Sequence, residues 1–251
     1  MTIKIKSLTK KYKDFVAVNN VSFDIKTNET FSLLGINGAG KTTLIKMLTG
    51  LTKKTNGEVF YDEYNIDKNL NEIKQIINIS PQENAVAENL TVKENIMFIA
   101  EIYGFSKEKI IKNTQNIINL LNLQEFENKK AKNLSGGTQR RLSLAMSLVT
   151  EPKILFLDEP TLGLDVLARE QLWDLIEKLK SKMTIILTTH YMEEAEKLSD
   201  RIGIIHNGEI IKIDTPSSLM KSTKTKSLEQ AFVKIVKGEK TWNILLFQNE
   251  I

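Results

Sequence analysis

The 251-residue sequence contains no cysteine, which excludes disulfide bonds, thiolate metal sites and cysteine nucleophiles. Arginine is scarce as well, because only four of the 35 basic residues are Arg, at positions 140, 141, 169 and 201. Arg is the residue that reads bases and clamps phosphates bidentately. The net charge of +4 therefore does not indicate a nucleic-acid-binding protein, and we expect no nucleic acid among its partners.

The sequence also lacks any run of about 18 uncharged apolar residues, so it predicts no transmembrane helix. Residues 1–13 alternate apolar and cationic side chains and contain no apolar core of a signal peptide. We therefore expect a cytoplasmic chain that reaches the inner face of a membrane only peripherally, through a partner. The content of 41% hydrophobic and 26% charged residues is ordinary for a globular protein and excludes a disordered chain.

Apolar periodicity divides the chain into a β-rich start, a helical insert and an alternating α/β half. Three short strands are expected within residues 2–34, followed by a helix at 42–51 and strands at 57–61 and 76–79. The period becomes helical over residues 89–133, where Thr91 and Glu94 form a capping box. Beyond residue 152, helices at 166–180 and 192–198 separate strands at 153–157, 184–188 and 201–206, which predicts a parallel sheet.

Residues 35–42, GINGAGKT, fit the pattern G-x-x-x-x-G-K-[ST] between an apolar strand and a helix. The glycines let successive backbone N–H groups turn toward a phosphate, and the helix N-terminus adds partial positive charge. Lys41 is expected to reach the β and γ phosphates, and Thr42 to offer its hydroxyl to Mg²⁺. The rest of the predicted phosphate-binding set is Asn37, Gly38, Ala39, Gly40 and Thr43. The loop predicts binding of a nucleoside triphosphate.

The buried strand pattern at 154–157 ends in two carboxylates, Asp158 and Glu159. Parallel sheets place ligands at this edge, so Asp158 is expected to hold Mg²⁺ through water. Glu159 would orient or deprotonate the water that attacks the γ-phosphate. A strand that ends in Asp-Glu commonly just begins a solvated loop, and the phosphate-binding loop in the same chain favours the catalytic interpretation.

A second glycine motif, Leu134-Ser-Gly-Gly-Thr-Gln-Arg-Arg141, stands directly before the helix expected at 142–149. Ser135, Gly136 and Gly137 predict another anion-binding helix start. One nucleotide does not need two anion-binding helix starts, so the start at Ser135 should serve the nucleotide of another chain. Here the sequence resembles the ATP-binding subunits of ABC transporters, whose signature is LSGGQ. The form SGGTQRR departs from it at Thr138 and is similar to ATPases of prokaryotic exporters.

The resemblance covers roughly residues 3–220 and implies further roles. Tyr12 lies where the family stacks an aromatic ring on adenine, and Gln82 resembles the Q-loop glutamine that joins the metal site to the helical lobe. Asp165 resembles the D-loop, and His190 the switch histidine that contacts the γ-phosphate. Each alone would more often be structural, and their order along the chain carries the assignment. His206, before the Asn207-Gly208 turn, is expected to be structural.

The resemblance implies an α/β fold, with a P-loop NTPase core of mainly parallel sheet, an N-terminal antiparallel β portion and a helical subdomain at about residues 83–150. Residues 1–220 would form the ATP-binding domain and residues 221–251 a linker and tail. Within the latter, residues 228–236 resemble the closing helix of such ATPases, and the sequence restarts at Trp242 after an interruption at Gly238. The apolar tail 242–251 is expected to pack on the chain's own core or in a dimer contact, with a membrane-surface helix as the alternative.

The function implied is an ATPase with ATP and Mg²⁺ as cofactors. Two identical or paralogous chains would close head to tail around ATP, each site drawing Lys41 from one chain and Ser135 from the other. The pair would power transport, in the direction of export, through a transmembrane permease. The alternative is a non-transport ABC ATPase acting on ribosomes or DNA, although no sustained heptads separate Lys41 from Asp158. A binding module without hydrolysis is disfavoured because Glu159 and His190 are intact.

Overall fold

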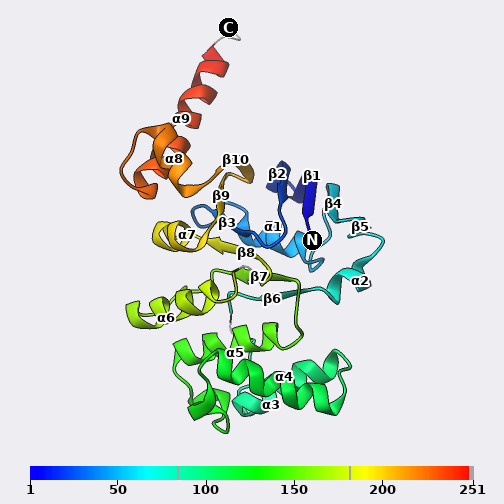
Figure 1. The fold of residues 1–251 in the computed structure, drawn as a ribbon. Coiled ribbons are helices and arrows are strands. Elements are labelled where there is room, and N and C mark those ends of the chain that lie inside the picture. Colours follow the sequence, from blue (N-terminus) through cyan, green and yellow to red (C-terminus); the bar gives the residue numbers. More distant parts are fainter. Residues whose placement is uncertain (84, 181, 249–251) are drawn as a thin grey trace.

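The computed structural model describes residues 1–83, 85–180 and 182–248, with side chains up to residue 238. Figure 1 shows three tiers, with an N-terminal sheet above, a larger sheet in the middle and a helical lobe below. The upper sheet is antiparallel, in the order β2-β1-β4-β5. Its strands are β1 (Ile3–Tyr12), β2 (Phe15–Ile25), β4 (Asn56–Tyr61) and β5 (Tyr64–Asn65).

The middle sheet has six strands in the order β10-β9-β3-β8-β7-β6. All pairs are parallel except the hairpin of β9 and β10. Every residue of the three central strands is buried, and their sequences are mainly apolar, as expected of strands covered on both faces. The strands are β3 (Thr30–Leu34), β6 (Ile77–Ser80), β7 (Ile154–Asp158), β8 (Thr184–Thr189), β9 (Arg201–His206) and β10 (Glu209–Asp214). The predicted α/β class, with its antiparallel N-terminal portion, is confirmed.

Helix α1 (Lys41–Leu48) joins the two sheets, because its buried residues belong to the same apolar cluster as β1 and β3. Gly40 precedes the helix and Lys41 is its first residue. Because α1 is packed in the core, the phosphate-binding loop that leads into it is fixed in position. The other helices around the sheets are α2 (Leu70–Lys74), α6 (Val166–Glu177), α7 (Met192–Leu198) and α8 (Pro216–Thr223).

The helical lobe consists of α3 (Val92–Ile102), α4 (Lys107–Leu120) and α5 (Gly136–Leu148), with short 3-10 helices at Gln124–Phe126 and Ala131–Asn133. Both halves of the predicted capping box between Thr91 and Glu94 are present. The lobe shares one apolar cluster with α6 and with one face of β7 and β8. One prediction here is wrong, because α5 begins at Gly136 and not at residue 142. The Ser-Gly-Gly motif is therefore the first turn of the helix and does not precede it.

The C-terminal segment is helical, and α9 (Leu228–Gln248) continues through Gly238, where the sequence suggested an interruption. Its first turns pack with Leu228 and Phe232 against Leu219 and Ile202. The predicted packing or membrane contact of the apolar tail 242–251 lies outside the side chains that are described. Within the described residues, no helix has the length and apolar content needed to span a bilayer.

Candidate nucleotide-binding and catalytic site

Four predicted groups each follow one of four adjacent parallel strands. The phosphate-binding loop follows β3, Glu159 follows β7, Gln82 follows β6 and His190 follows β8. Because parallel strands present their carboxyl ends at the same edge of a sheet, residues far apart in sequence converge there. The sheet order thus explains how the predicted site is assembled.

The loop between β3 and α1 needs glycine for conformation and for space. Gly38 and Gly40 have φ of 80° and 104°, which are left-handed values that side chains disfavour. A Cβ on Gly40 would lie 2.5 Å from the carbonyl oxygen of Ala17, so no larger residue fits there without moving β2. Gly40 is the N-cap of α1 and has no side chain to bond the first N–H groups of the helix. These donors are left for an external acceptor.

A cavity of about 380 Å³ opens at this edge of the sheet. It is lined by Phe15, Ala17, Asn37, Gly38, Gly40, Lys41, Thr42, Thr43, Gln82, Glu159 and Leu162. The structure therefore brings most of the predicted phosphate-binding set together with Gln82 and Glu159. The volume lies in the range of small-molecule sites.

Lys41, Glu159 and His190 form a chain of contacts at the cavity wall. Lys41 is only 4% exposed, and its Nζ lies 3.2 Å from Glu159 Oε1 while donating to the carbonyl oxygen of Gly35 at 2.8 Å. His190 Nδ1 lies 2.9 Å from Glu159 Oε2, close but without the alignment of a hydrogen bond. A buried ammonium group requires an anionic partner, and Glu159 supplies it. Both oxygens of the predicted catalytic carboxylate are thus in contact with other site residues.

Asp158 is positioned by two hydroxyl groups. Its Oδ1 accepts hydrogen bonds from Thr42 Oγ1 at 3.1 Å and from Thr188 Oγ1 at 2.6 Å. Thr188 Oγ1 also accepts from the backbone N–H of Glu159 at 3.0 Å. Sequence reasoning missed Thr188, although it pairs with Asp158 in the parallel register of β7 and β8. The carboxylate and hydroxyl oxygens are hard ligands, so the donor set suits the predicted Mg²⁺.

The aromatic residue that lines the cavity is Phe15. Tyr12 pairs with Phe15 across the β1-β2 hairpin, and Lys10 Nζ lies 4.6 Å from the centre of the Tyr12 ring. Tyr12 is 45% exposed but does not line the cavity, so its role in stacking adenine stays a prediction. Sequence reasoning missed Phe15, which follows the turn at the tip of the same hairpin.

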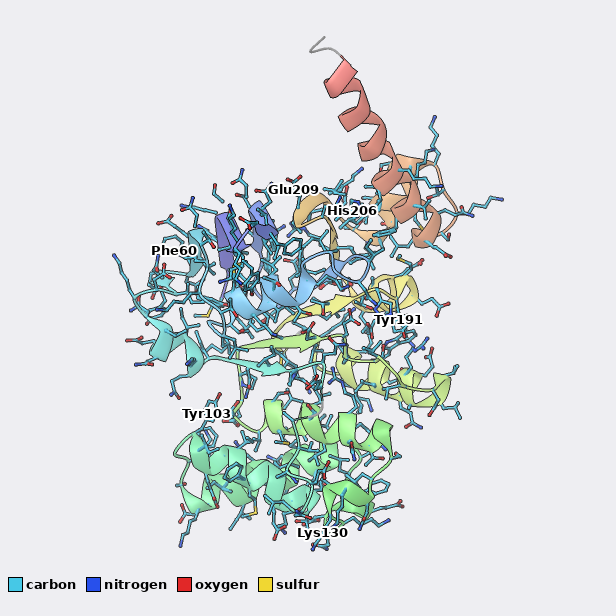
Figure 2. All side chains as sticks on the ribbon, turned by 180° about the vertical axis from the view of Figure 1, so that it is seen from behind. Phe60, Tyr103, Lys130, Tyr191, His206 and Glu209 are labelled. Carbon is cyan, nitrogen blue, oxygen red and sulfur yellow. The ribbon has the colours of Figure 1, made fainter. Side chains whose placement is uncertain are left out.

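The β9-β10 hairpin supports the loop from behind. Gly208 N donates to the carbonyl oxygen of Ala39 at 3.0 Å, and Asn19 N donates to that of Gly208 at 2.8 Å. Figure 2 shows His206 and Glu209 on this hairpin. His206 is buried at the end of β9 and does not line the cavity, in keeping with the structural role expected of it.

The Ser-Gly-Gly motif lies at a different place, on the helical lobe. Ser135 caps α5 by accepting from Thr138 N at 3.3 Å, and Asp165 caps α6 by accepting from Ala168 N at 2.9 Å. A Cβ on Gly137 would lie 3.0 Å from the Cβ of Ala168, so these two helix starts are neighbours. None of Ser135, Gly136, Gly137 and Asp165 lines the cavity around Lys41.

A phosphate-binding loop, an Asp-Glu pair on a nearby strand and a Ser-Gly-Gly helix start on an inserted lobe define the class of ABC-type ATP-binding domains. The chain belongs to the ABC transporter family, whose model matches residues 18–162. This confirms the family, the fold and the ATPase class that the sequence predicted.

Two curated relatives and one solved structure show the extent of the similarity. The human phospholipid-transporting ATPase ABCA3 is 39% identical over 212 residues, which are 83% of this chain and 12% of that protein. The linearmycin resistance ATP-binding protein LnrL of Bacillus subtilis (strain 168) is 38% identical over 218 residues, 86% of this chain and 70% of that protein. The chain thus spans a small part of ABCA3 and most of LnrL. A similar solved structure is the ATP-binding cassette MJ0796 in a dimeric post-hydrolysis state bound to ADP and Pi. Its TM-score with this chain is 0.77 at 30% sequence identity, and the match covers 85% of this chain and 98% of the MJ0796 chain.

Proposed function

We propose that this chain is an ATP-hydrolysing subunit that dimerises around ATP and powers export through a transmembrane permease. One observation carries the proposal. The cavity contains the phosphate-binding loop, Gln82 and Glu159 but none of the Ser-Gly-Gly motif, so each site is complete only when a second chain supplies Ser135 and Gly137.

ATP binding would rearrange the contacts of Lys41. The γ-phosphate competes with Glu159 for the ammonium group, and the N-terminal N–H groups of α1 bind the phosphate oxygens. Once Lys41 has turned to the phosphates, Glu159 Oε1 accepts a proton from the attacking water. His190 remains beside Oε2 and restrains the carboxylate. Water adds to the γ-phosphorus as the bond to the β-phosphate oxygen breaks, giving ADP and phosphate. Mg²⁺, held by Thr42, Asp158 and Gln82, would neutralise charge on the phosphate oxygens.

The surface around the second motif fits a copy of the same class of chain. Leu162, Val166 and Leu167 are 39%, 69% and 76% exposed and lie on both sides of Asp165, next to the start of α5. Neighbouring apolar side chains that are exposed favour a protein contact over a solvated surface. The dimeric state of the similar cassette MJ0796 supports the same arrangement, with identical or paralogous chains.

The partner in the membrane would dock where the core meets the helical lobe. A crevice of about 140 Å³ lies there, lined by residues that include Leu51, Ile77 and Tyr103. Figure 2 shows Tyr103 on the side of the lobe toward the core and Lys130 at its far side. Leu51, Phe98 and Ile102 are 60%, 49% and 62% exposed, and the last two share a face of α3. Export is favoured by the similarity to ABCA3, a phospholipid-transporting ATPase, and to LnrL, a linearmycin resistance ATP-binding protein.

The test uses Glu159→Gln, which keeps the size of the side chain but removes the base. ATP turnover should fall about 10² to 10⁴-fold, while ATP binding is retained. ATP should then trap a dimer that size-exclusion chromatography resolves, because the closed state no longer hydrolyses its nucleotide. Turnover like that of the wild type would remove Glu159 from the mechanism. When the chain is purified from native cells, we expect a membrane permease to co-purify with it. Co-purification with ribosomes instead would favour the non-transport alternative.

A further inference from the structure

The Arg140 side chain extends from helix α5 of the helical lobe into the catalytic core, next to a second contact in which the Ser143 hydroxyl lies 3.1 Å from the Ser80 hydroxyl at the end of β6. Arg140 is 4% exposed. Its Nε donates to the carbonyl oxygen of Pro160 at 2.7 Å, and its Nη2 donates to that of Asp158 at 3.0 Å. Its Nη1 donates to the carbonyl oxygens of Gln82, at 3.3 Å, and of Pro81. One guanidinium group therefore binds both segments that carry catalytic residues.

These four acceptors are main-chain atoms, so the arrangement fixes backbone positions. Pro81 and Gln82 belong to the segment after β6, and Asp158 and Pro160 flank the catalytic Glu159. Burial lowers the pKa of Arg140 to about 10, and the side chain stays protonated at neutral pH. A planar fork of five N–H donors can hold two segments at once, whereas a lysine ammonium group is a point charge on a flexible stem. The geometry is thus specific to arginine.

Arg140 lies on the same helix as Ser135, little more than one turn further along. A movement of Gln82 or Asp158 would therefore move the Ser-Gly-Gly helix start as well, through the Arg140 side chain and the first turns of α5. In the proposed dimer, Gln82, Asp158 and Glu159 act on this chain's own ATP, while Ser135 contacts the ATP bound by the partner. The two ends of this path belong to different nucleotide sites.

We infer that Arg140 is a positioning residue that couples the two ATP sites of the dimer, by fixing the signature helix to the backbone around Gln82 and Asp158. This inference rests on the proposed function. Occupation of one site would set the orientation of the helix start that completes the other. The coupling should appear as cooperativity in ATP, which a purely structural arginine would not produce.

The test compares Arg140→Lys with a matched control, Arg141→Lys. Arg141 is the next residue of α5 and is only half-buried. It donates to the carbonyl oxygen of Asn122 and to Thr138 Oγ1, both at 3.3 Å and both on the lobe itself, so it does not bridge the lobe to the core. Steady-state ATPase activity is measured over a range of ATP concentrations. Binding of a fluorescent ATP analogue to dilute monomer reports on the cavity alone, and thermal unfolding reports on the fold.

For Arg140→Lys we expect kcat to fall about 10- to 100-fold and the Hill coefficient to drop from well above 1 to about 1. Affinity of the monomer for the analogue should stay within about threefold, because Arg140 does not line the cavity. In the Glu159→Gln background, Arg140→Lys should raise the ATP concentration for half-maximal dimer about tenfold. Arg141→Lys should change none of these quantities by more than about twofold.

Several outcomes would overturn the inference. They are an unchanged kcat, a Hill coefficient that stays the same or is already about 1 in the wild type, and a parallel loss of analogue binding and thermal stability. The proposed function fails separately, if the wild type shows no turnover that depends on Glu159, and the inference then fails with it. Glu159-dependent turnover with a normal Arg140→Lys variant would defeat the inference alone.

Discussion

Helices α1 and α5 both begin next to glycine and both are predicted to bind phosphate, yet the structure builds their N-termini differently. Helix α1 starts from Gly40 in a left-handed conformation and places buried Lys41 in a cavity with Glu159. Helix α5 starts from exposed Ser135 in an extended conformation, with the hydroxyl bonded to its own Thr138 N. The first site is enclosed by its own chain, and the second faces solvent.

This difference gives the two helix starts separate roles, one in binding ATP and the other in assembling the dimer that hydrolyses it. The cavity at α1 holds Lys41 and Glu159 in place within a single chain, so we expect a monomer to bind the nucleotide there. The start of α5 offers backbone donors on an open surface, where a phosphate would remain hydrated and the interaction would be weak. We therefore expect α1 to determine affinity for ATP and α5 to determine whether bound ATP is hydrolysed.

The largest effect should come from disabling each helix start in turn. Lys41→Ala removes a charge-assisted contact and should weaken ATP binding to the monomer about 10- to 100-fold. Ser135→Arg blocks the start of α5 and should leave monomer binding within about twofold, while turnover falls to background. Equilibrium binding of labelled ATP and a phosphate-release assay measure the two quantities. Equal loss of monomer binding in both variants would abolish the distinction between the two regions.

Mixing these two inactive variants should restore part of the activity. In a heterodimer of Lys41→Ala and Ser135→Arg chains, one composite site carries both lesions and the other carries none. With random pairing, about a quarter of all sites are intact. The control is the purified heterodimer of one wild-type chain and one chain that carries both lesions, since each of its composite sites then has one lesion and it should be inactive. If heterodimers form and the first mixture stays inactive, the head-to-tail arrangement is wrong.

A smaller effect is expected from the hydroxyl that positions Asp158 and Glu159. Thr188→Val should lower kcat about tenfold and stability by about 1 to 3 kcal/mol, because a buried carboxylate and a backbone N–H each lose a partner. Thr184→Val is the control at the other end of β8, where the hydroxyl accepts from Asn28 N at 2.9 Å, away from the site. Thermal unfolding should show a loss in both variants. Only Thr188→Val should slow turnover, and normal kcat in that variant would show that Thr42 alone positions Asp158.

The smallest effect concerns Glu194 of α7, which bonds both the loop after β7 and helix α6. Its Oε1 accepts from Thr161 Oγ1 at 2.8 Å and from Trp173 Nε1 at 3.0 Å, and burial raises the pKa of this carboxyl. A raised pKa in the folded state means that its contribution to stability is present below the ordinary pKa and is lost as pH rises through the folded value. Glu194→Gln removes this pH dependence of the folding stability. The melting temperature of the variant, relative to that of the wild type, should therefore increase from acidic to alkaline pH. Exposed Glu193→Gln is the control, and a constant difference across pH would show that Glu194 does not titrate differently on folding.

The sequence located most of the strands but not β5 or β10, and it misjudged two helices. Gly136 and Gly137 disfavour helix interiors, which led to a predicted start at residue 142. The first helical turn makes no N–H bonds within the helix, so glycine is tolerated there when Ser135 supplies the cap. Gly238 suggested an interruption, yet a glycine inside a helix costs only about 1 kcal/mol, and α9 continues.

By itself the sequence determined which residues could bind phosphate and metal, because that chemistry needs glycine, lysine, hydroxyl and carboxylate groups at fixed local spacings. Residues 35–42, Asp158 and Glu159 are recognisable for this reason, and so is the family. Only the tertiary structure decided that Glu159 contacts Lys41 and His190, that Thr188 holds Asp158, that Phe15 lines the cavity, and that Arg140 bridges two catalytic segments. These contacts depend on the register of β7 against β8 and on the packing of α5 against the core. Such pairings join distant parts of the chain and leave no local pattern in the sequence.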